Sequence, residues 1–330
     1  MFHRNYFIIC LLILGVLILL PMGGAAVQEP DPSADQSRPD KTVLTLGQAA
    51  ILGVVEGLTE YLPVSSTGHL LLAERILSIG DDPAASVEQK ARTKEATDAY
   101  TICIQIGAII AVLGLYFRRV KQMLLGLVGK DAAGRQLLIS VIAGFLPAAV
   151  IGLLFNKLIK SYLFGTWPVI VAWFVGGVAI LVVSRWNRSR GGRSASSGRT
   201  ILELTWQMAL IIGFIQCIAM WPGVSRSLVT IVGGLLVGLS LSAAVEFSFL
   251  LGLITLSAAT GYDALKHGQV MLQTFDILSL AVGVVFAFVA ALLSVKWMVG
   301  YLNRHGLAIF GYYRIALSLV AGTLLLTGVI

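Results

Sequence analysis

The chain has 330 residues, of which 57% are hydrophobic and only 12% are charged. Soluble domains carry about 25% charged residues, so the composition excludes an ordinary soluble protein and indicates an integral membrane protein. The formal net charge of +7 does not indicate nucleic-acid binding. The Arg and Lys residues cluster in short links between apolar runs, as the topology of membrane proteins requires, and we therefore expect no nucleic-acid partner.

The first 26 residues combine Arg4, an apolar run that ends at Leu20, and small residues up to Ala26. This pattern predicts a secretory signal peptide over residues 1–26, and an uncleaved N-terminal anchor is the alternative. The polar, Pro-containing residues 27–43 predict a flexible linker. The membrane domain is then expected over residues 44–330.

Six later segments are apolar and long enough, at about twenty residues, to cross a hydrocarbon layer of roughly 30 Å as helices. They are Asp98–Phe117, Leu137–Phe155, Trp167–Ser184, Ala244–Leu265, Ile277–Lys296 and Leu307–Val329. The links Arg118–Arg135 and Arg185–Arg199 are rich in Arg and Lys, which predicts a cytoplasmic location. The links Asn156–Thr166 and Lys266–Phe275 carry few basic residues and are expected on the other side.

Two more apolar stretches, Leu46–Leu77 and Ile201–Leu239, are each interrupted in the middle by Pro and Ser. The alternation of the six spans requires the first stretch to begin and end outside and the second to begin and end inside. Non-helical backbone at membrane depth is tolerated only where it is buried in protein or lines a wet cavity. We therefore predict two re-entrant helical hairpins that enter from opposite faces. The polar segment Asp81–Thr97 is expected to be a loop.

The two hairpins also resemble each other in sequence. When "GVVEGLTEYLPVSS" (Gly53–Ser66) is set over "GFIQCIAMWPGVSR" (Gly213–Arg226) without gaps, Gly, Val and Ser coincide at three positions. Weak similarity combined with opposite insertion is typical of an inverted-topology repeat, in which the broken elements meet and build the site. The expected fold is an all-α polytopic membrane protein, with a first repeat over about residues 44–184 and a second over about 201–330.

The second helix of each hairpin begins with Ser or Thr, in "SSTGH" and "SRSL". Helix N-termini offer unpaired N–H groups and a partial positive charge, so two that face each other predict an anion pocket. Arg226 lies at the start of one of them, and its guanidinium can bind a phosphate through two parallel hydrogen bonds. The further candidates for diphosphate binding, which serve only as helix caps in the alternative interpretation, are Ser65, Thr67, Ser225 and Ser227.

Three carboxylates lie in the apolar segments. Glu56 and Glu60 are four residues apart and share one helical face, so a divalent cation between them would relieve their repulsion and neutralise diphosphate oxygens. We expect both as metal ligands, and Glu60 also as a catalytic residue. Hydrogen bonding between helices is the alternative for this pair. For Glu246, a place in the site and a contact with another helix are both open.

His69 follows Ser66 by three residues, so both side chains can face the same way in the first helical turn. An imidazole next to a hydroxyl is the minimal pair of base and nucleophile. We predict that Ser66 attacks phosphorus and that His69 is its base. Alternatively, His69 activates a water molecule directly or protonates the leaving phosphate. A histidine that only packs in the core or at the membrane interface is the other alternative for this residue.

The stretches "GVVEGLTEYLPVSSTGHL" and "WPGVSRS", followed by "EFSFLL", resemble the signature motifs of the undecaprenyl-diphosphate phosphatase family, the bacitracin-resistance proteins of bacteria. The resemblance extends from Leu46 to the C-terminus. It implies hydrolysis of a long-chain isoprenoid diphosphate to the monophosphate carrier used in peptidoglycan synthesis, with Mg or Ca as the divalent cation. It also implies a location in the bacterial inner membrane, with the active site on the periplasmic side. The residues to which it assigns function are Glu56, Glu60, Ser66, His69, Ser225, Arg226 and Ser227.

One position departs from the family pattern, because Leu228 follows Ser227 where the motif usually has Gly. We expect Leu228 to narrow the pocket, while Thr230 remains available as a polar group. The expected partners are the polyprenyl diphosphate substrate and membrane lipids. A homodimer is compatible with the sequence, which does not decide the oligomeric state.

A secondary transporter or lipid flippase is the alternative function, since inverted repeats and broken helices are equally typical of transporters. The discriminating feature is the set of Ser66, His69 and Arg226, because a transporter needs an anion site but no nucleophile with a base. A scaffold for cell-wall enzymes is the remaining alternative.

Overall fold

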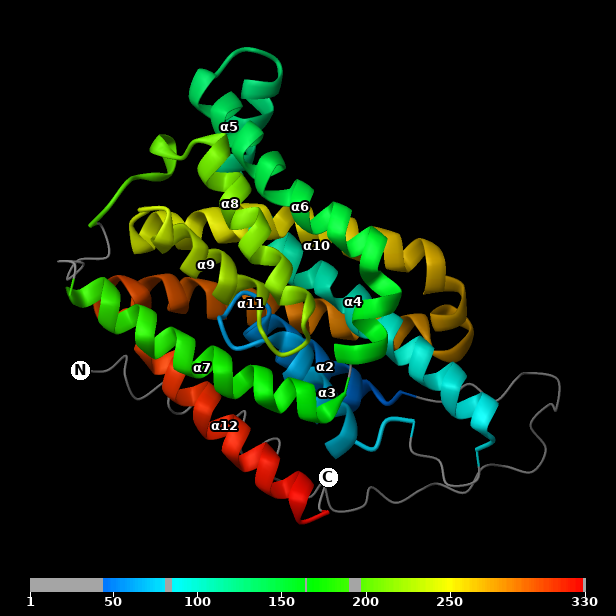
Figure 1. The fold of residues 1–330 in the computed structure, drawn as a ribbon. Helices are drawn as coiled ribbons and strands as arrows, with labels where there is room; N and C mark the ends of the chain where they lie inside the picture. The colour runs from blue at the N-terminus through cyan, green and yellow to red at the C-terminus, as the bar shows by residue number, and fades with distance from the viewer. Residues whose placement is uncertain (1–43, 81–84, 164, 190–196, 329–330) are drawn as a thin grey trace.

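The computed structural model describes residues 44–80, 85–163, 165–189 and 197–328 (Figure 1). The expected signal segment over residues 1–26 and the linker over residues 27–43 lie outside the described residues. Within these described ranges the regular structure is helical, apart from one isolated parallel bridge between Arg199 and Leu239.

Six helices are long and apolar enough to cross a membrane, which confirms the six predicted spans. These helices are α4 (Val87–Leu115), α6 (Ala132–Leu163), α7 (Thr166–Ser189), α10 (Leu241–Thr274), α11 (Ile277–His305) and α12 (Ala308–Leu326). A shorter amphipathic helix, α5 (Phe117–Leu127), lies in the first basic link, and a 3-10 turn, η1 (Ile201–Glu203), precedes the second hairpin.

The prediction of a loop over Asp81–Thr97 is wrong from Val87 onward, because helix α4 begins at that residue. The side chain of Ser86 accepts a hydrogen bond from the backbone N–H of Gln89, and the Gln89 side chain accepts one from the backbone of Ser86. Such a capping box starts a helix regardless of hydropathy. Hydropathy alone therefore locates the lipid-embedded part of α4 and misses its polar first turns.

Helix α10 extends in the same way through the predicted link Lys266–Phe275. Its polar end packs beside the polar beginning of α4, where Glu95 lies 2.7 Å from His267 and Arg92 donates to Gln273 over 3.2 Å. The extensions stabilise each other as helices outside the apolar part of the spans.

Two pairs of short helices occupy the predicted hairpin segments. They are α2 (Leu46–Thr59) with α3 (Ser66–Ile76), and α8 (Trp206–Gln216) with the 3-10 turn η2 (Cys217–Met220) and α9 (Arg226–Leu236). Helices of 11 to 14 residues reach only about 16–21 Å at a rise of ~1.5 Å per residue, which is less than the ~30 Å of a hydrocarbon core. These lengths fit the predicted re-entrant hairpins.

The gap-free register that pairs Gly53 with Gly213 also pairs the helices that contain them. It aligns the first residues of α2 and α8, and it aligns both ends of α3 with both ends of α9. The paired residues Ser65 and Ser225 share an unusual backbone conformation, with φ of 75° and 79°. Since left-handed backbone is uncommon for residues other than Gly, this match shows that the two hairpins repeat one local structure.

Each hairpin packs against a span from the other predicted repeat, α2 against α11 and α8 against α6. Glycines permit this close approach: a Cβ at Gly53 would lie 2.3 Å from the Gly283 carbonyl, and one at Gly213 would lie 2.4 Å from the Gly144 carbonyl. Helices α4 and α10 pack together, and α7 and α12 lie side by side along one edge (Figure 1). The breaks of both hairpins are thereby enclosed by protein.

We expect Gly213→Ala to lower the free energy of unfolding by about 1–3 kcal/mol, because the added methyl group must push α8 away from the backbone of α6. Thermal unfolding in detergent measures the effect. The matched control is Gly261→Ala in α10, where an added Cβ meets nothing within 4 Å and the melting temperature should hold or rise. Equal melting temperatures for the two variants would contradict the close packing.

Candidate active site

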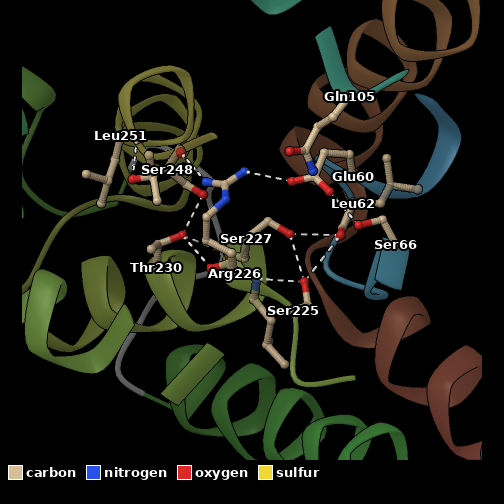
Figure 2. Close-up of polar contacts among 12 residues, drawn as sticks. Glu60, Leu62, Ser66, Gln105, Ser225, Arg226, Ser227, Thr230, Ser248 and Leu251 are labelled. Atoms are coloured by element: carbon tan, nitrogen blue, oxygen red, sulfur yellow. Dashed lines mark hydrogen bonds and ion pairs between the residues drawn. The ribbon is translucent and has the colours of Figure 1, made fainter. Parts of the chain in front are cut away.

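The two helix breaks meet directly. Ser227, in the first turn of α9, donates a hydrogen bond of 2.8 Å to the backbone carbonyl of Leu62 in the first hairpin (Figure 2). Ser225 contacts the same carbonyl over 3.5 Å and also caps α9 by accepting from the N–H of Leu228. The polar tips of both hairpins therefore form one cluster, as the sequence analysis expected.

Glu60 contacts polar side chains from the tips of both hairpins. One of its carboxylate oxygens accepts a hydrogen bond from the hydroxyl of Ser66, and the other lies 3.6 Å from Nη2 of Arg226 (Figure 2). Ser66 and Glu60 are buried. The Ser66 hydroxyl, the Glu60 carboxylate and the Arg226 guanidinium thus lie one after another where the tips of the two hairpins meet.

The Arg226 guanidinium is held by contacts that leave some of its N–H donors without a hydrogen-bond partner among the described residues. Its Nη1 donates to the Ser248 carbonyl of α10 over 3.1 Å, and its guanidinium carbon lies 5.6 Å from the centre of the Tyr61 ring. Among the described residues, its buried Nε and Nη2 atoms have no hydrogen-bond partner. Because a guanidinium binds oxyanions through two parallel N–H bonds, Arg226 is ready to accept an anion beside Glu60.

The helix N-termini add further donors. Ser65 precedes α3, and its side chain makes no capping hydrogen bond, so the first N–H groups of α3 remain for another acceptor. Ser225 caps α9 only at Leu228. Thr67, the other candidate in this region, is exposed.

The expected hydrogen bond between Ser66 and His69 does not form in the structure. Nδ1 of His69 lies 2.7 Å from the Ser65 carbonyl, and Nε2 lies 2.7 Å from the Tyr313 hydroxyl. A carbonyl only accepts, so Nδ1 carries the proton, and in a neutral imidazole Nε2 then accepts from Tyr313. The fully buried ring also stacks on Tyr313 and meets Trp173 edge-on. Ser66 binds the charged carboxylate of Glu60 instead, which is the stronger acceptor.

Glu56 lies one turn before Glu60 and is fully buried. Neither of its carboxylate oxygens has a hydrogen bond of ordinary geometry among the described residues, and the Gln105 amide is its neutral polar neighbour. No group of three or more His, Cys, Asp or Glu side chains suited to a metal ion occurs in the described part of the chain. The described residues therefore place two carboxylates here, and both oxygens of Glu60 already have polar partners, whereas Glu56 has only the Gln105 amide nearby.

The remaining candidates lie at the margin of the cluster or outside it. Leu228 is buried. The Thr230 hydroxyl forms hydrogen bonds with the Ser248 hydroxyl over 2.6 Å and with the Arg226 carbonyl over 2.9 Å, so Thr230 helps to hold Arg226 in position. Glu246 forms an ion pair of 2.7 Å with Arg119 of α5, which resolves its open assignment in favour of a contact between helices.

Sequence reasoning missed several polar residues of the spans that contact this region. A signal was present, because polar and charged side chains within spans are functional by default and each of these interrupts an apolar run. The missed residues are Gln105, Ser248, Tyr313 and Arg314.

Comparison with known proteins agrees with the family resemblance seen in the sequence motifs. The model of the bacitracin resistance protein BacA family matches residues 49–320, from within α2 to within α12, and so covers all or most of both hairpins and of each of the six spans. The chain belongs to the BacA family. Its BacA relatives include one from Sorangium cellulosum, named undecaprenyl-diphosphatase, which is 45% identical over 82% of this chain and 83% of its own length. Another, undecaprenyl-diphosphatase 2 from Rhodospirillum rubrum, is 44% identical over 84% of this chain and 94% of its own length.

The position of His69 in this BacA protein leads to a test of its role. We expect His69→Phe to lower the free energy of unfolding by several kcal/mol, because the Ser65 carbonyl and the Tyr313 hydroxyl each lose a buried partner worth about 1–3 kcal/mol. Thermal unfolding measures this, with His305→Phe at an exposed position as control. An unchanged melting temperature with activity lost would instead indicate a purely chemical role.

Proposed function

We propose that this BacA protein hydrolyses undecaprenyl diphosphate to undecaprenyl phosphate and inorganic phosphate, and so recycles the lipid carrier of cell-wall synthesis and confers bacitracin resistance. The observation that carries the proposal is the Glu60 carboxylate, shared between the hydroxyl of Ser66 and the guanidinium of Arg226. The names of the relatives point to the same reaction. A hydroxyl bonded to a carboxylate beside a partly free guanidinium is suited to phosphoryl transfer, which needs positioning and charge stabilisation above all.

Binding of the diphosphate begins with its charge. The free Nε and Nη2 donors of Arg226 bind the terminal phosphate, and the N–H groups at the starts of α3 and α9 bind the remaining oxygens. In the structure Glu60 lies next to Arg226, so the phosphate enters between these two side chains. The polyprenyl tail stays among the lipids around the spans.

In the chemical step the Ser66 Oγ attacks the terminal phosphorus. The bond from this phosphorus to the bridging oxygen breaks, and undecaprenyl phosphate leaves with that oxygen. Glu60, which already accepts the hydrogen bond of Ser66, takes the hydroxyl proton. Water then attacks the phosphorus of the phosphorylated Ser66, and the bond from phosphorus to Oγ breaks. Glu60 returns its proton to Oγ, and the protons of the water leave with inorganic phosphate. Direct attack by water, with Glu60 as base, is the variant mechanism.

A divalent cation, Mg or Ca, is part of this proposal. The buried and uncommitted oxygens of Glu56 fit such an ion, and Mg sites in phosphate chemistry often use one or two carboxylates, with substrate oxygens and water completing the shell. When bound, the ion neutralises charge on the diphosphate. Glu56 would hold the ion, and Glu60 would assist from the next turn.

The BacA protein is a multi-pass protein, and we propose that it resides in the bacterial inner membrane with its active site open to the periplasm. The basic links Arg118–Arg135 and Arg185–Arg199 support a cytoplasmic location for those links. The absence of a nucleic-acid partner is a further part of the proposal, supported by the placement of the basic residues in the links between spans. Assembly as a homodimer is also proposed and is compatible with the sequence.

Transport or flipping of a phosphorylated isoprenoid is the second candidate function. The observation that favours it is the repeated backbone of the two hairpins, since transporters are also built from such repeats. The hydrogen bond from Ser66 to Glu60 favours hydrolysis, because a transport site requires no activated nucleophile.

We expect Glu60→Gln to lower kcat by about 10²–10⁴-fold, the usual contribution of a general base, and Ser66→Ala to lower it at least as much. The measurement is phosphate release from farnesyl diphosphate by purified protein in detergent. Glu246→Gln is the matched control, because this carboxylate lies outside the cluster and should leave kcat within a few-fold of wild type.

Acid quench during turnover with labelled diphosphate distinguishes the two mechanisms. Label on Ser66 supports the phosphoserine route, whereas its absence favours direct attack by water. Full activity of Ser66→Ala would rule out Ser66 as the nucleophile.

Removal of the cation gives a separate test. We expect chelator to abolish phosphate release by the wild type, and Glu56→Gln to raise the Mg concentration for half-maximal activity by at least about 10-fold, as loss of a metal contact does. A titration of Mg against phosphate release measures this. Undiminished activity in excess chelator would contradict the cation proposal.

A further inference from the structure

Arg314, in α12, is a fully buried cation that donates only to backbone carbonyls. Its five hydrogen bonds join Nε to Trp173 (3.3 Å), Nη1 to Pro63 (3.3 Å) and Val224 (3.0 Å), and Nη2 to Ala172 (2.9 Å) and Gly223 (2.7 Å). A guanidinium has five N–H donors, so every one of them is used. No ion pair of Arg314 occurs among the described residues.

Three of these carbonyls belong to the two helix breaks. Pro63 lies just before Ser65 in the first hairpin, and Gly223 occupies the paired position in the second hairpin, followed by Val224. A break in a helix leaves carbonyls without their usual partners, and in an apolar interior each one needs another donor. One side chain therefore supplies the missing donors of both breaks.

The surrounding helix leaves room for this arrangement. A Cβ at Gly176 of α7 would lie 2.3 Å from Nη2 of Arg314. The other two acceptors, the carbonyls of Ala172 and Trp173, belong to the preceding turn of the same helix. Helix α7 thus fixes the guanidinium from one side while both breaks bind it from the other.

We propose that Arg314 is a positioning residue, which sets the separation of the two breaks and so the placement of Ser66 and Glu60 relative to Arg226. It acts through the backbone on either side of the cluster and does not touch the substrate. Lysine cannot replace it, because an ammonium has three donors and no planar fork to reach five acceptors. The inference rests on the proposed function for its kinetic readout.

The test compares two neighbouring glycines. Gly176→Ala pushes on the guanidinium of Arg314, at 2.3 Å from Nη2. Gly177→Ala crowds Ile315 and the Gly311 carbonyl at the same contact between α7 and α12, and it meets Arg314 only at Cβ, over 3.2 Å, away from the guanidinium. We expect both variants to lower the melting temperature, but only Gly176→Ala to lower kcat, by up to about 100-fold as for a displacement near 1 Å. Arg314→Lys should lower kcat at least as much at temperatures where it is fully folded. Arg119→Lys is its control.

A double-mutant cycle makes the test specific to positioning. Arg226→Ala should lower kcat by a much smaller factor in the Gly176→Ala background than in wild type, because the tips are already displaced. Independent factors that multiply, or wild-type kcat in Gly176→Ala and Arg314→Lys, would overturn the inference.

Absence of phosphate release by wild type would refute the proposed function and leave Arg314 to be tested by binding. In that case farnesyl methylenediphosphonate is the probe, and its affinity should fall in Gly176→Ala but not in Gly177→Ala. Equal affinities in the two variants would overturn the positioning role as well.

Discussion

Backbone that leaves a helix inside an apolar interior must find partners for its freed polar groups, and this requirement governs the whole molecule. Two hairpins break at Ser65 and Ser225, and the carbonyls before both breaks are satisfied by the single guanidinium of Arg314. The Leu62 carbonyl is satisfied by Ser227 of the opposite hairpin. Each break is therefore completed by groups from elsewhere in the fold, and neither tip has its observed structure without the other.

The same constraint explains why the polar cluster forms where it does. Once the breaks are joined, the first turns of α3 and α9 are brought together, and Ser66, Glu60 and Arg226 come into contact. Because these groups are buried, losing any one of these contacts would cost more free energy than at the surface, since an unpaired polar group is costly in a low-dielectric interior. Among the described residues, the Glu56 oxygens and the Nε and Nη2 atoms of Arg226 have no hydrogen bond of ordinary geometry, although Nη2 lies 3.6 Å from Glu60. These groups have opposite charge and are the ones that we expect to meet a cation and an anionic substrate.

Much of this was readable from the sequence. Hydropathy predicted the six spans, and the Pro and Ser interruptions predicted a break in the middle of each hairpin segment, which the structure has at Ser65 and Ser225. Charges within apolar segments require a partner, so Glu60 and Arg226 were predicted as site residues, and the structure brings them into one cluster. The extension of α4 to Val87 was missed, since a polar helix outside the lipid leaves no hydropathy signal and depends on the cap at Ser86.

The pairing of side chains was less predictable. The spacing of Ser66 and His69 suggested a catalytic pair, but spacing along one helix does not reveal competing partners from other helices. Ser66 bonds to Glu60, at the C-terminal end of α2, and His69 bonds to Tyr313 of α12, so the two side chains do not bond to each other. The role of Arg314 was not predicted, because its hydrogen-bond acceptors are backbone carbonyls, which have no signature in the sequence.

The shared backbone of the hairpins has an evolutionary consequence. Two identical half-length chains related by a two-fold axis would present the same side chains on both tips, so acid would face acid or cation would face cation. Because both halves lie in one chain, their sequences are free to differ. The first hairpin carries the acids Glu56 and Glu60, while the second carries the neutral Gln216 in the position paired with Glu56 and the cation Arg226, so the two tips present opposite charges to the same cluster.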